Sequence, residues 1–191
     1  MDARSKIVLD VLVPVWVASE VLLGMLRRAR DEGDRSADRG SSLLLWGAIL
    51  GSVACAVALR GVDAGRVPAG FQGLHVIALA LLAAGLALRW WAILTLGRLF
   101  TMTLAVRDGH NVITHGPYRR IRHPAYAGML LAFAGCGLWM ESWLSTAALL
   151  VPIGAVVLHR IRVEEEALVE ALGEPYRRYR EGTKLLIPWL C

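Results

Sequence analysis

Residues 116–128 read GPYRRIRHPAYAG, a polar cluster placed directly before an apolar run. Arginines at such a boundary are ordinary topology signals of membrane proteins. A His-Pro-x-Tyr-x-Gly sequence that leads into the apolar run is a less common combination. It predicts a binding site at a membrane surface.

The composition around this cluster is that of a membrane protein. Of the 191 residues, 56% are hydrophobic and 19% are charged, and the mean hydropathy is +0.51. Soluble domains carry about 25% charged residues and about 45–50% apolar ones. The apolar residues form continuous runs, each close to the roughly 20 residues that a membrane-spanning helix needs. Continuous runs without alternation favour helices over a barrel, so we expect an all-α polytopic membrane protein.

Five apolar segments are expected to cross the membrane. They cover residues 7–26, 42–59, 73–96, 126–140 and 143–159. Only Glu141-Ser142 separates the last two segments, which predicts a tight turn and an antiparallel helical hairpin. Pro152 is expected to kink the fifth segment.

The basic residues predict the topology. Sixteen of the 21 Lys and Arg residues lie after the first segment, after the third segment or in the C-terminal tail, whereas four lie on the opposite side. The positive-inside rule therefore places the N-terminus outside and the C-terminus, with residues 116–128, in the cytoplasm. Because topology explains these charges, the net charge of +5 is not expected to mean nucleic-acid binding. Membrane lipids are the expected surroundings.

The tail reads as a structured segment. Residues 160–172 are expected to extend the fifth helix out of the membrane, with Gly173 as its C-cap. Glu174-Pro175 then starts a short helix over residues 176–181. The apolar residues 185–190 are expected to return to the membrane interface.

Three consecutive carboxylates, Glu164 to Glu166, stand in this extension. Such a run is most often a solvated helix face. However, Arg160 precedes Glu164 by four residues, so the two share a face. Consecutive side chains point about 100° apart, so one or two of the three carboxylates at most can face a common site.

His123 is the other candidate for chemistry, although a lone histidine more often has a structural role. Pro124 disfavours helix at the preceding residue, so His123 is expected in an extended turn. Gly128, in the next helix, permits close approach of a ligand or of a neighbouring helix.

Three charged residues lie inside the expected apolar segments, namely Asp10, Glu20 and Arg89, and Asp10 lies near the outer end, where it can reach the interface. Glu20 and Arg89 lie at similar depths, so we expect them to pair or to line a polar cavity. Cys55, Cys136 and Cys191 show no metal-ligand spacing, so neither a disulfide framework nor a metal site is expected.

Together these residues resemble the isoprenylcysteine carboxyl methyltransferase family. The matching stretches are LRWWA (88–92), TLGR (95–98), VITHGPYR (112–119), RHPAYAG (122–128), Arg160, EE (164–165), LGEPY (172–176), Tyr179 and IP (187–188). They follow one another in order through roughly the last hundred residues. The first two apolar segments match only as hydrophobic segments.

The resemblance implies an integral membrane methyltransferase that uses S-adenosylmethionine. Its cofactor would bind on the cytoplasmic side, beneath the C-terminal segment, and its methyl group would pass to a lipophilic acceptor such as the carboxylate of an isoprenylcysteine. Residues 1–191 would then form one domain, with two N-terminal membrane helices in residues 1–72 and the catalytic core in residues 73–191. The oligomeric state is left open.

The resemblance also implies roles for individual residues. Those expected around the cofactor are Val112, Ile113, His115, Tyr118, His123, Pro124, Tyr126, Gly128, Glu164 and Glu165. Arg122 and Arg160 would orient the acceptor, and with Glu165 they form the expected catalytic set. A carboxylate acceptor needs no base, only desolvation and orientation.

Other acceptors and activities stay open. A thiol or amine acceptor would need a general base, for which His123 or His115 is the candidate. The main rival is a membrane NADPH-dependent reductase of the sterol-reductase type, in which Arg122 could hold a phosphate. The Glu164-Glu165 pair argues against such an anionic cofactor. A scaffold or small transporter is less favoured because the polar residues gather on one side of the membrane.

Overall fold

The structure is a computed structural model that describes residues 16, 36–68, 71, 73–97 and 112–187. Residues 37–191 form one unit, and the description below concerns this unit alone. Its regular elements are α2 (Ser36–Leu59), η1 (Asp63–Gly65), α3 (Leu74–Leu96), η3 (Gly116–Arg119), α4 (Pro124–Trp139), α5 (Trp143–Leu172) and α6 (Glu174–Gly182). All of them are helical, so the expected all-α class is confirmed for the described residues.

Four of the five predicted apolar segments coincide with α2, α3, α4 and the first part of α5, whereas residues 7–26 lie outside the described residues. Among the described helices, α3 and α5 are long and apolar enough to cross a membrane. The apolar helical stretches Leu43–Leu59 and Pro124–Trp139 are shorter. The fivefold crossing and its orientation therefore stay predictions.

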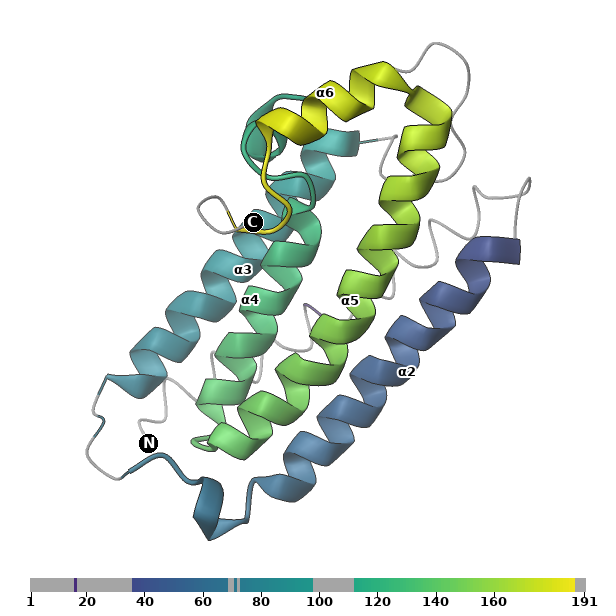
Figure 1. The fold of residues 1–191 in the computed structure, drawn as a ribbon. Helices are drawn as coiled ribbons and strands as arrows, with labels where there is room; N and C mark the ends of the chain where they lie inside the picture. Colours follow the sequence, from purple (N-terminus) through teal and green to yellow (C-terminus); the bar gives the residue numbers. More distant parts are fainter. Residues whose placement is uncertain (1–15, 17–35, 69–70, 72, 98–111, 188–191) are drawn as a thin grey trace. The chain divides into compact units, whose positions relative to one another are not determined.

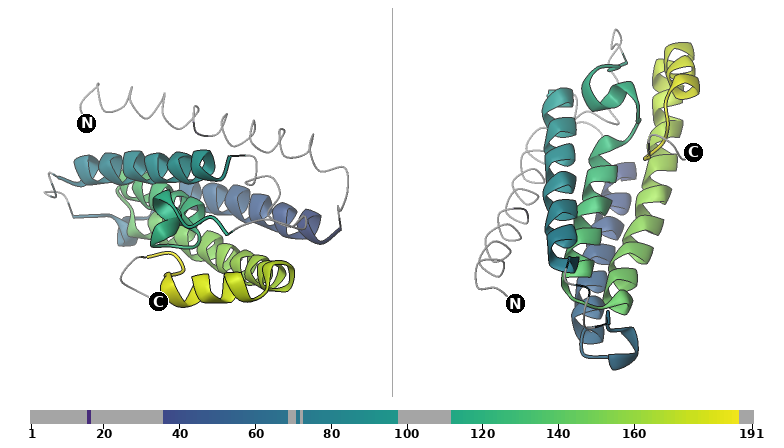
Figure 2. Two further views of the ribbon diagram at one scale, coloured as in Figure 1. Left: turned by 90° about the horizontal axis from the view of Figure 1, so that it is seen from above. Right: turned by 90° about the vertical axis from the view of Figure 1, so that its left-hand side faces the viewer.

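Helices α3 and α4 lie side by side in all three views, in direct backbone contact (Figures 1 and 2). A Cβ atom added at Gly85 would lie 2.5 Å from the backbone nitrogen of Ala132. One added at Gly128 would lie 2.6 Å from the backbone nitrogen of Arg89. Small residues let membrane helices approach this closely and gain van der Waals contact. The structure thus accounts for Gly128 through helix packing.

One buried stripe runs along α5 with a spacing of four residues. It consists of Ser145, Leu149, Ile153, Val157, Ile161 and Glu165. Each four-residue step advances about 40° around a helix, so the stripe winds as it proceeds. Near its start Ser145 Oγ donates to the carbonyl of Ala56 on α2 at 2.8 Å. At its other end the stripe presents Glu165 to the segment before α4.

The ends of α5 follow the predicted signals. The tight turn at Glu141-Ser142 is confirmed, with Glu141 at φ 54° and the Ser142 Oγ accepting from the amide of Ser145 at 3.1 Å. The helix runs unbroken through Pro152 and ends at Gly173, the predicted C-cap, with φ 61°. Helix α6 follows at once and turns across the end of α5, close to η3 (Figure 1).

The contact between α3 and α4 predicts that Gly85→Ala lowers the midpoint of thermal unfolding in detergent. The new methyl group would press on the backbone of α4, which cannot rotate away as a flexible side chain could. We therefore expect the free energy of unfolding to fall by about 1–3 kcal/mol. The matched control is Gly154→Ala in α5, where a Cβ meets nothing within 4 Å. Alanine should stabilise that position slightly. Equal midpoints for the two variants would contradict the packing.

Candidate functional site

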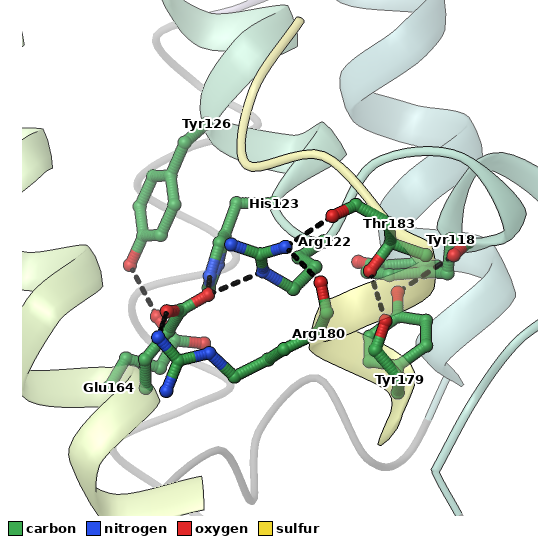
Figure 3. A network of polar contacts seen from close by, with 9 residues as sticks. Tyr118, Arg122, His123, Tyr126, Glu164, Tyr179, Arg180 and Thr183 are labelled. Carbon is green, nitrogen blue, oxygen red and sulfur yellow. Dashed lines mark hydrogen bonds and ion pairs between the residues drawn. The ribbon is translucent and has the colours of Figure 1, made fainter. Parts of the chain in front are cut away.

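Most of the predicted polar residues meet where α4 begins, α5 leaves its apolar part and α6 packs across (Figure 3). We call this group the polar network. It consists of Arg122, His123, Tyr126, Arg160, Glu164, Glu165 and Arg180. The segment before α4, helix α4, helix α5 and helix α6 each contribute to it, so it forms only when these four parts are folded together.

Glu165 is the centre of the polar network. Its Oε1 accepts a hydrogen bond of 2.6 Å from Arg122 Nε and lies 3.3 Å from His123 Nε2. Its Oε2 lies 3.2 Å from Arg180 Nη2. The side chain is only 9% exposed, and both carboxylate oxygens have partners. A buried carboxylate requires such partners, since an unpaired one would be costly.

These partners keep Glu165 ionised. The residue lies 22 positions after Trp143, or roughly 33 Å along the helix, beyond the roughly 30 Å of a bilayer's hydrocarbon core. Burial alone would raise the pKa of Glu165, but the hydrogen bonds and charges of His123 and Arg122 outweigh burial and lower the pKa to about 2. Glu165 is therefore an anion at neutral pH.

Glu164 faces a second set of partners. The hydroxyl of Tyr126 donates to Glu164 Oε2 at 3.1 Å and accepts from Arg160 Nε at 2.8 Å. Arg160 and Glu164 thus meet at one tyrosine, as their expected common helix face requires. The sequence left open which of Glu164 and Glu165 faces inward. In the structure both carboxylates accept hydrogen bonds within the polar network.

The C-terminal segment pairs with the residues before α4 through backbone hydrogen bonds. The amide of Arg122 donates to the carbonyl of Lys184 at 2.8 Å, and that of His123 donates to Leu185 at 3.1 Å. In return the amide of Lys184 donates to Arg120 at 3.0 Å. We call this pairing of residues 120–123 with residues 183–185 the clasp. Through it the tail lies against the segment that leads into α4. The expected closure of a cofactor pocket by the tail stays a prediction.

The side chain of Arg122 strengthens the clasp. Besides Glu165, it donates through Nη1 to the carbonyl of Arg180 at 3.0 Å and to the carbonyl of Thr183. Its side chain is 11% exposed. Arg122 therefore joins α5 to both the end of α6 and the segment that follows.

Three tyrosines stand on η3 and α6, of which Tyr118 and Tyr176 are buried and Tyr179 is half-buried. The Tyr179 hydroxyl donates to the carbonyl of Tyr118 at 2.7 Å. Burial raises the pKa of Tyr118 and of Tyr176, and it raises that of Tyr179 to about 12. All three therefore remain neutral near pH 7 and can donate hydrogen bonds.

Three predicted cofactor residues lie before η3 rather than in the polar network. Val112 and Ile113 are half-buried and His115 is exposed. In the described part of the chain, no hydrogen bond joins them to the network. Gly116 places this segment against the end of α3, since a Cβ there would lie 3.1 Å from Thr95 Oγ1. Their expected role stays a prediction.

Two further predicted residues meet at the start of α4, namely Pro124 on α4 and Arg89 on α3. Pro124 is the buried first residue of the helix. Arg89 donates through Nη1 to the carbonyl of Ala125 at 3.0 Å, which joins α3 to the first turn of α4. Its expected partner, Glu20, lies outside the described residues, so that pairing stays a prediction.

The sequence reasoning missed Arg180 and Thr183 as members of the site. A signal was present, because Tyr176, Tyr179, Arg180 and Thr183 follow the i, i+3, i+4, i+7 spacing of one helix face. The contacts of Arg180 and Thr183 depend on the clasp, and local sequence patterns do not predict the clasp.

Three comparisons with known proteins bear on this site. The model of the "Isoprenylcysteine carboxyl methyltransferase (ICMT) family" matches residues 76–170. A probable protein-S-isoprenylcysteine O-methyltransferase of Oryza sativa subsp. indica is 32% identical over 116 residues, which are 60% of this chain and 61% of that protein. A methanethiol S-methyltransferase of Mycobacterium tuberculosis is 38% identical over 77 residues, 39% of this chain and 30% of that protein.

A solved structure resembles the fold. It is the eukaryotic intramembrane Ras methyltransferase ICMT, with a TM-score of 0.63 and 22% sequence identity over 93% of this chain and 64% of that one. The chain thus spans somewhat less than two thirds of the rice protein and of this structure. At this identity the likeness concerns the fold, and with the apolar helices it indicates an integral membrane protein.

The charge of Glu165 predicts a pH dependence of stability. Its pKa is about 2 in the folded protein against an ordinary value of 4.5, so its contribution is present above pH 4.5 and is lost as the pH falls toward 2. Glu165→Gln should therefore lower the midpoint of thermal unfolding at pH 6, and the difference from wild type should shrink below pH 4.5. The control is Glu166→Gln at an exposed neighbour. A difference that is constant between pH 6 and pH 3 would contradict this reading.

Proposed function

Because the chain belongs to the isoprenylcysteine carboxyl methyltransferase family, we propose that it is an integral membrane enzyme that moves a methyl group from S-adenosylmethionine to a lipophilic acceptor. The observation that carries the proposal is the polar network around Glu165. It lies in and directly beyond the family-matched segment, where α4 begins and α5 leaves its apolar part. The acceptor class we propose is a carboxylate of the isoprenylcysteine type.

The donor set fits S-adenosylmethionine by its chemistry. That molecule carries a sulfonium, an amino-acid group and ribose hydroxyls, so it requires both anionic acceptors and cationic donors. Glu165 supplies an ionised carboxylate, and the network's guanidinium groups can pair with a carboxylate. We propose that Glu164, Glu165, His123 and Tyr126 hold the cofactor. The bound cofactor would supply an electrophilic methyl group and a thioether that leaves without needing an acid.

Further residues complete this proposed site. Tyr118, whose carbonyl accepts from the Tyr179 hydroxyl, and Pro124, the buried first residue of α4, would line the site, and Gly128 packs α4 closely against α3. Val112, Ile113 and His115 would approach the cofactor from the segment before η3.

The chain's own residues would position the acceptor. Arg160 reaches Tyr126 from α5, so we assign the orientation of an acceptor carboxylate to Arg160. Arg122, which the sequence placed beside it in this role, already donates to Glu165 and to two tail carbonyls. We assign to Arg122 the task of holding Glu165 and the clasp in place. A carboxylate nucleophile then needs only desolvation and an in-line approach.

The proposed setting is a membrane crossed five times, with the N-terminus outside and the cofactor site on the cytoplasmic side. Large apolar side chains point outward from the described helices, for example Leu50 on α2 at 68% exposure and Leu94 on α3 at 73%. Lipid would cover them. A lipophilic acceptor would enter from the bilayer and the cofactor from the cytoplasm.

A thiol acceptor is the second candidate, because 77 residues of this chain are 38% identical to a methanethiol S-methyltransferase. A thiol needs a base, since the thiolate is the nucleophile. His123 is placed for that task, because Glu165 Oε1 lies 3.3 Å from its Nε2 and can fix the orientation of the ring.

The family match, rather than the carboxylate pair, is the main argument against the reductase alternative. Glu164 and Glu165 both already accept from cationic or hydroxyl groups, so they offer little unpaired negative charge to repel a phosphate. The presence of two carboxylates is thus a weaker argument against NADPH than the sequence suggested.

Cofactor binding tests the proposal. Calorimetry on detergent-purified protein should show micromolar binding of S-adenosylmethionine and S-adenosylhomocysteine and no binding of NADPH. Glu165→Ala and His123→Ala should each weaken adenosyl binding by at least about tenfold, which corresponds to about 1.4 kcal/mol. Glu166→Ala, at the exposed neighbouring carboxylate, is the control and should bind as wild type does. NADPH binding without adenosyl binding would support the reductase instead.

The pH dependence of methyl transfer tests the acceptor class. With an isoprenylcysteine carboxylate the rate should be flat from pH 6 to pH 8, because that nucleophile is already ionised. A rate that rises with pH, occurs with a small thiol and falls strongly in His123→Gln would favour the thiol.

A further inference from the structure

Arg180 is the cation of the polar network that a ligand can most readily reach. Its side chain is 44% exposed, whereas that of Arg122 is 11% exposed. It stands on α6, which the sequence-based site did not include. Because the Arg180 side of this pair is partly exposed and Glu165 keeps Arg122 and His123, a ligand donor could replace Arg180 at Glu165 without leaving the carboxylate unpaired.

Glu165 can release Arg180 without losing its other partners. Arg122 and His123 both contact Oε1, whereas Arg180 contacts Oε2 at 3.2 Å. If Arg180 turned toward a ligand, Oε2 would become available to a donor from that same ligand. The carboxylate and the guanidinium could therefore each take one charged group of an amino acid.

The local charge favours a further anion. Arg122 and Arg180 contribute two positive charges and Glu165 one negative charge. The net charge of this group is therefore +1 when His123 is neutral. Arg160 and Glu164, joined through Tyr126, cancel each other. A ligand carboxylate would neutralise this excess, and arginine binds carboxylates with two parallel hydrogen bonds.

Arg180 also connects ligand binding to the tail. Its carbonyl accepts from Arg122 Nη1 at 3.0 Å, while its guanidinium reaches Glu165. A ligand held by Arg180 would thus be held by α6 itself and would keep the tail in its closed position.

We infer that Arg180 is a further ligand-binding residue, whose guanidinium binds the carboxylate of a molecule in the site. This inference rests on the proposed function, in which two molecules carry such a group: the cofactor with its amino-acid carboxylate, and the acceptor. Arg180 exchanges Glu165 for this carboxylate on binding.

The test compares Arg180→Gln with Arg178→Gln. Arg178 lies two residues earlier on the same helix, is 78% exposed and contacts only Glu174, at 3.3 Å, among the described residues. Binding is measured in lipid nanodiscs for two matched pairs of probes. S-adenosylhomocysteine is paired with 5′-methylthioadenosine, which lacks the amino-acid group. N-acetyl-S-farnesylcysteine is paired with its methyl ester, which lacks the anionic carboxylate.

Arg180→Gln should weaken one carboxylate-bearing probe by about tenfold or more and leave its partner probe unchanged. Weaker S-adenosylhomocysteine binding identifies the cofactor as the source of the carboxylate, and weaker farnesylcysteine binding identifies the acceptor. Arg178→Gln should change neither pair. Arg180→Lys, which keeps the charge but not the paired donors, should show a smaller loss and serves where Arg180→Gln lowers the unfolding midpoint.

Two results overturn the inference in distinguishable ways. If the wild-type protein binds the probes and the Arg180 variants bind all four of them as Arg178→Gln does, the role of Arg180 is refuted and the proposed function stands. If the wild-type protein binds none of the four probes, the proposed function fails and the inference fails with it.

Discussion

The ionised carboxylate of Glu165 is the constraint on which the rest of the site depends. An anion that is 9% exposed requires partners, and Glu165 finds them in Arg122, His123 and Arg180. These lie in the segment before α4 and in α6. Without Glu165 the two guanidinium groups would face each other with no anion between them, and the clasp would lose its anchor on α5.

The helices set the position of this carboxylate. Glycine contacts fix α4 against α3, and thereby fix Arg122 and His123, which directly precede α4. The winding stripe of α5 begins against α2 at Ser145 and ends toward those two residues at Glu165. The polar groups thus stand at the ends of packed helices rather than on unsupported loops. The proposed methyl transfer depends on in-line positioning, which such a frame would provide.

Sequence patterns predicted the elements well because their signals are local. Gly173 ends α5, Glu141-Ser142 forms the turn, and the apolar runs mark α2 to α5. The cluster from Arg122 to Tyr126 was recognisable for the same reason. Its partners on α5 were recognisable too, but the direction of each carboxylate was not, because that depends on how the stripe winds.

The contacts of the tail could not be read from local patterns. The clasp joins residues 120–123 to residues 183–185, more than 60 positions apart, and neither segment has a strand pattern. Arg180 reaches Glu165 only because the clasp places α6 there. The same long-range pairing gives Arg122 its acceptors in the tail, and thus a structural task that its sequence context did not suggest.

Hydrogen exchange with and without S-adenosylhomocysteine would show whether an adenosyl cofactor binds at Glu165 beneath the clasp. We expect the ligand to slow exchange at the amides of Arg122, His123 and Lys184, which form the clasp, and to leave exchange at the turn around Glu141 unchanged. Binding that protects other regions while the clasp exchanges at its original rate would contradict it.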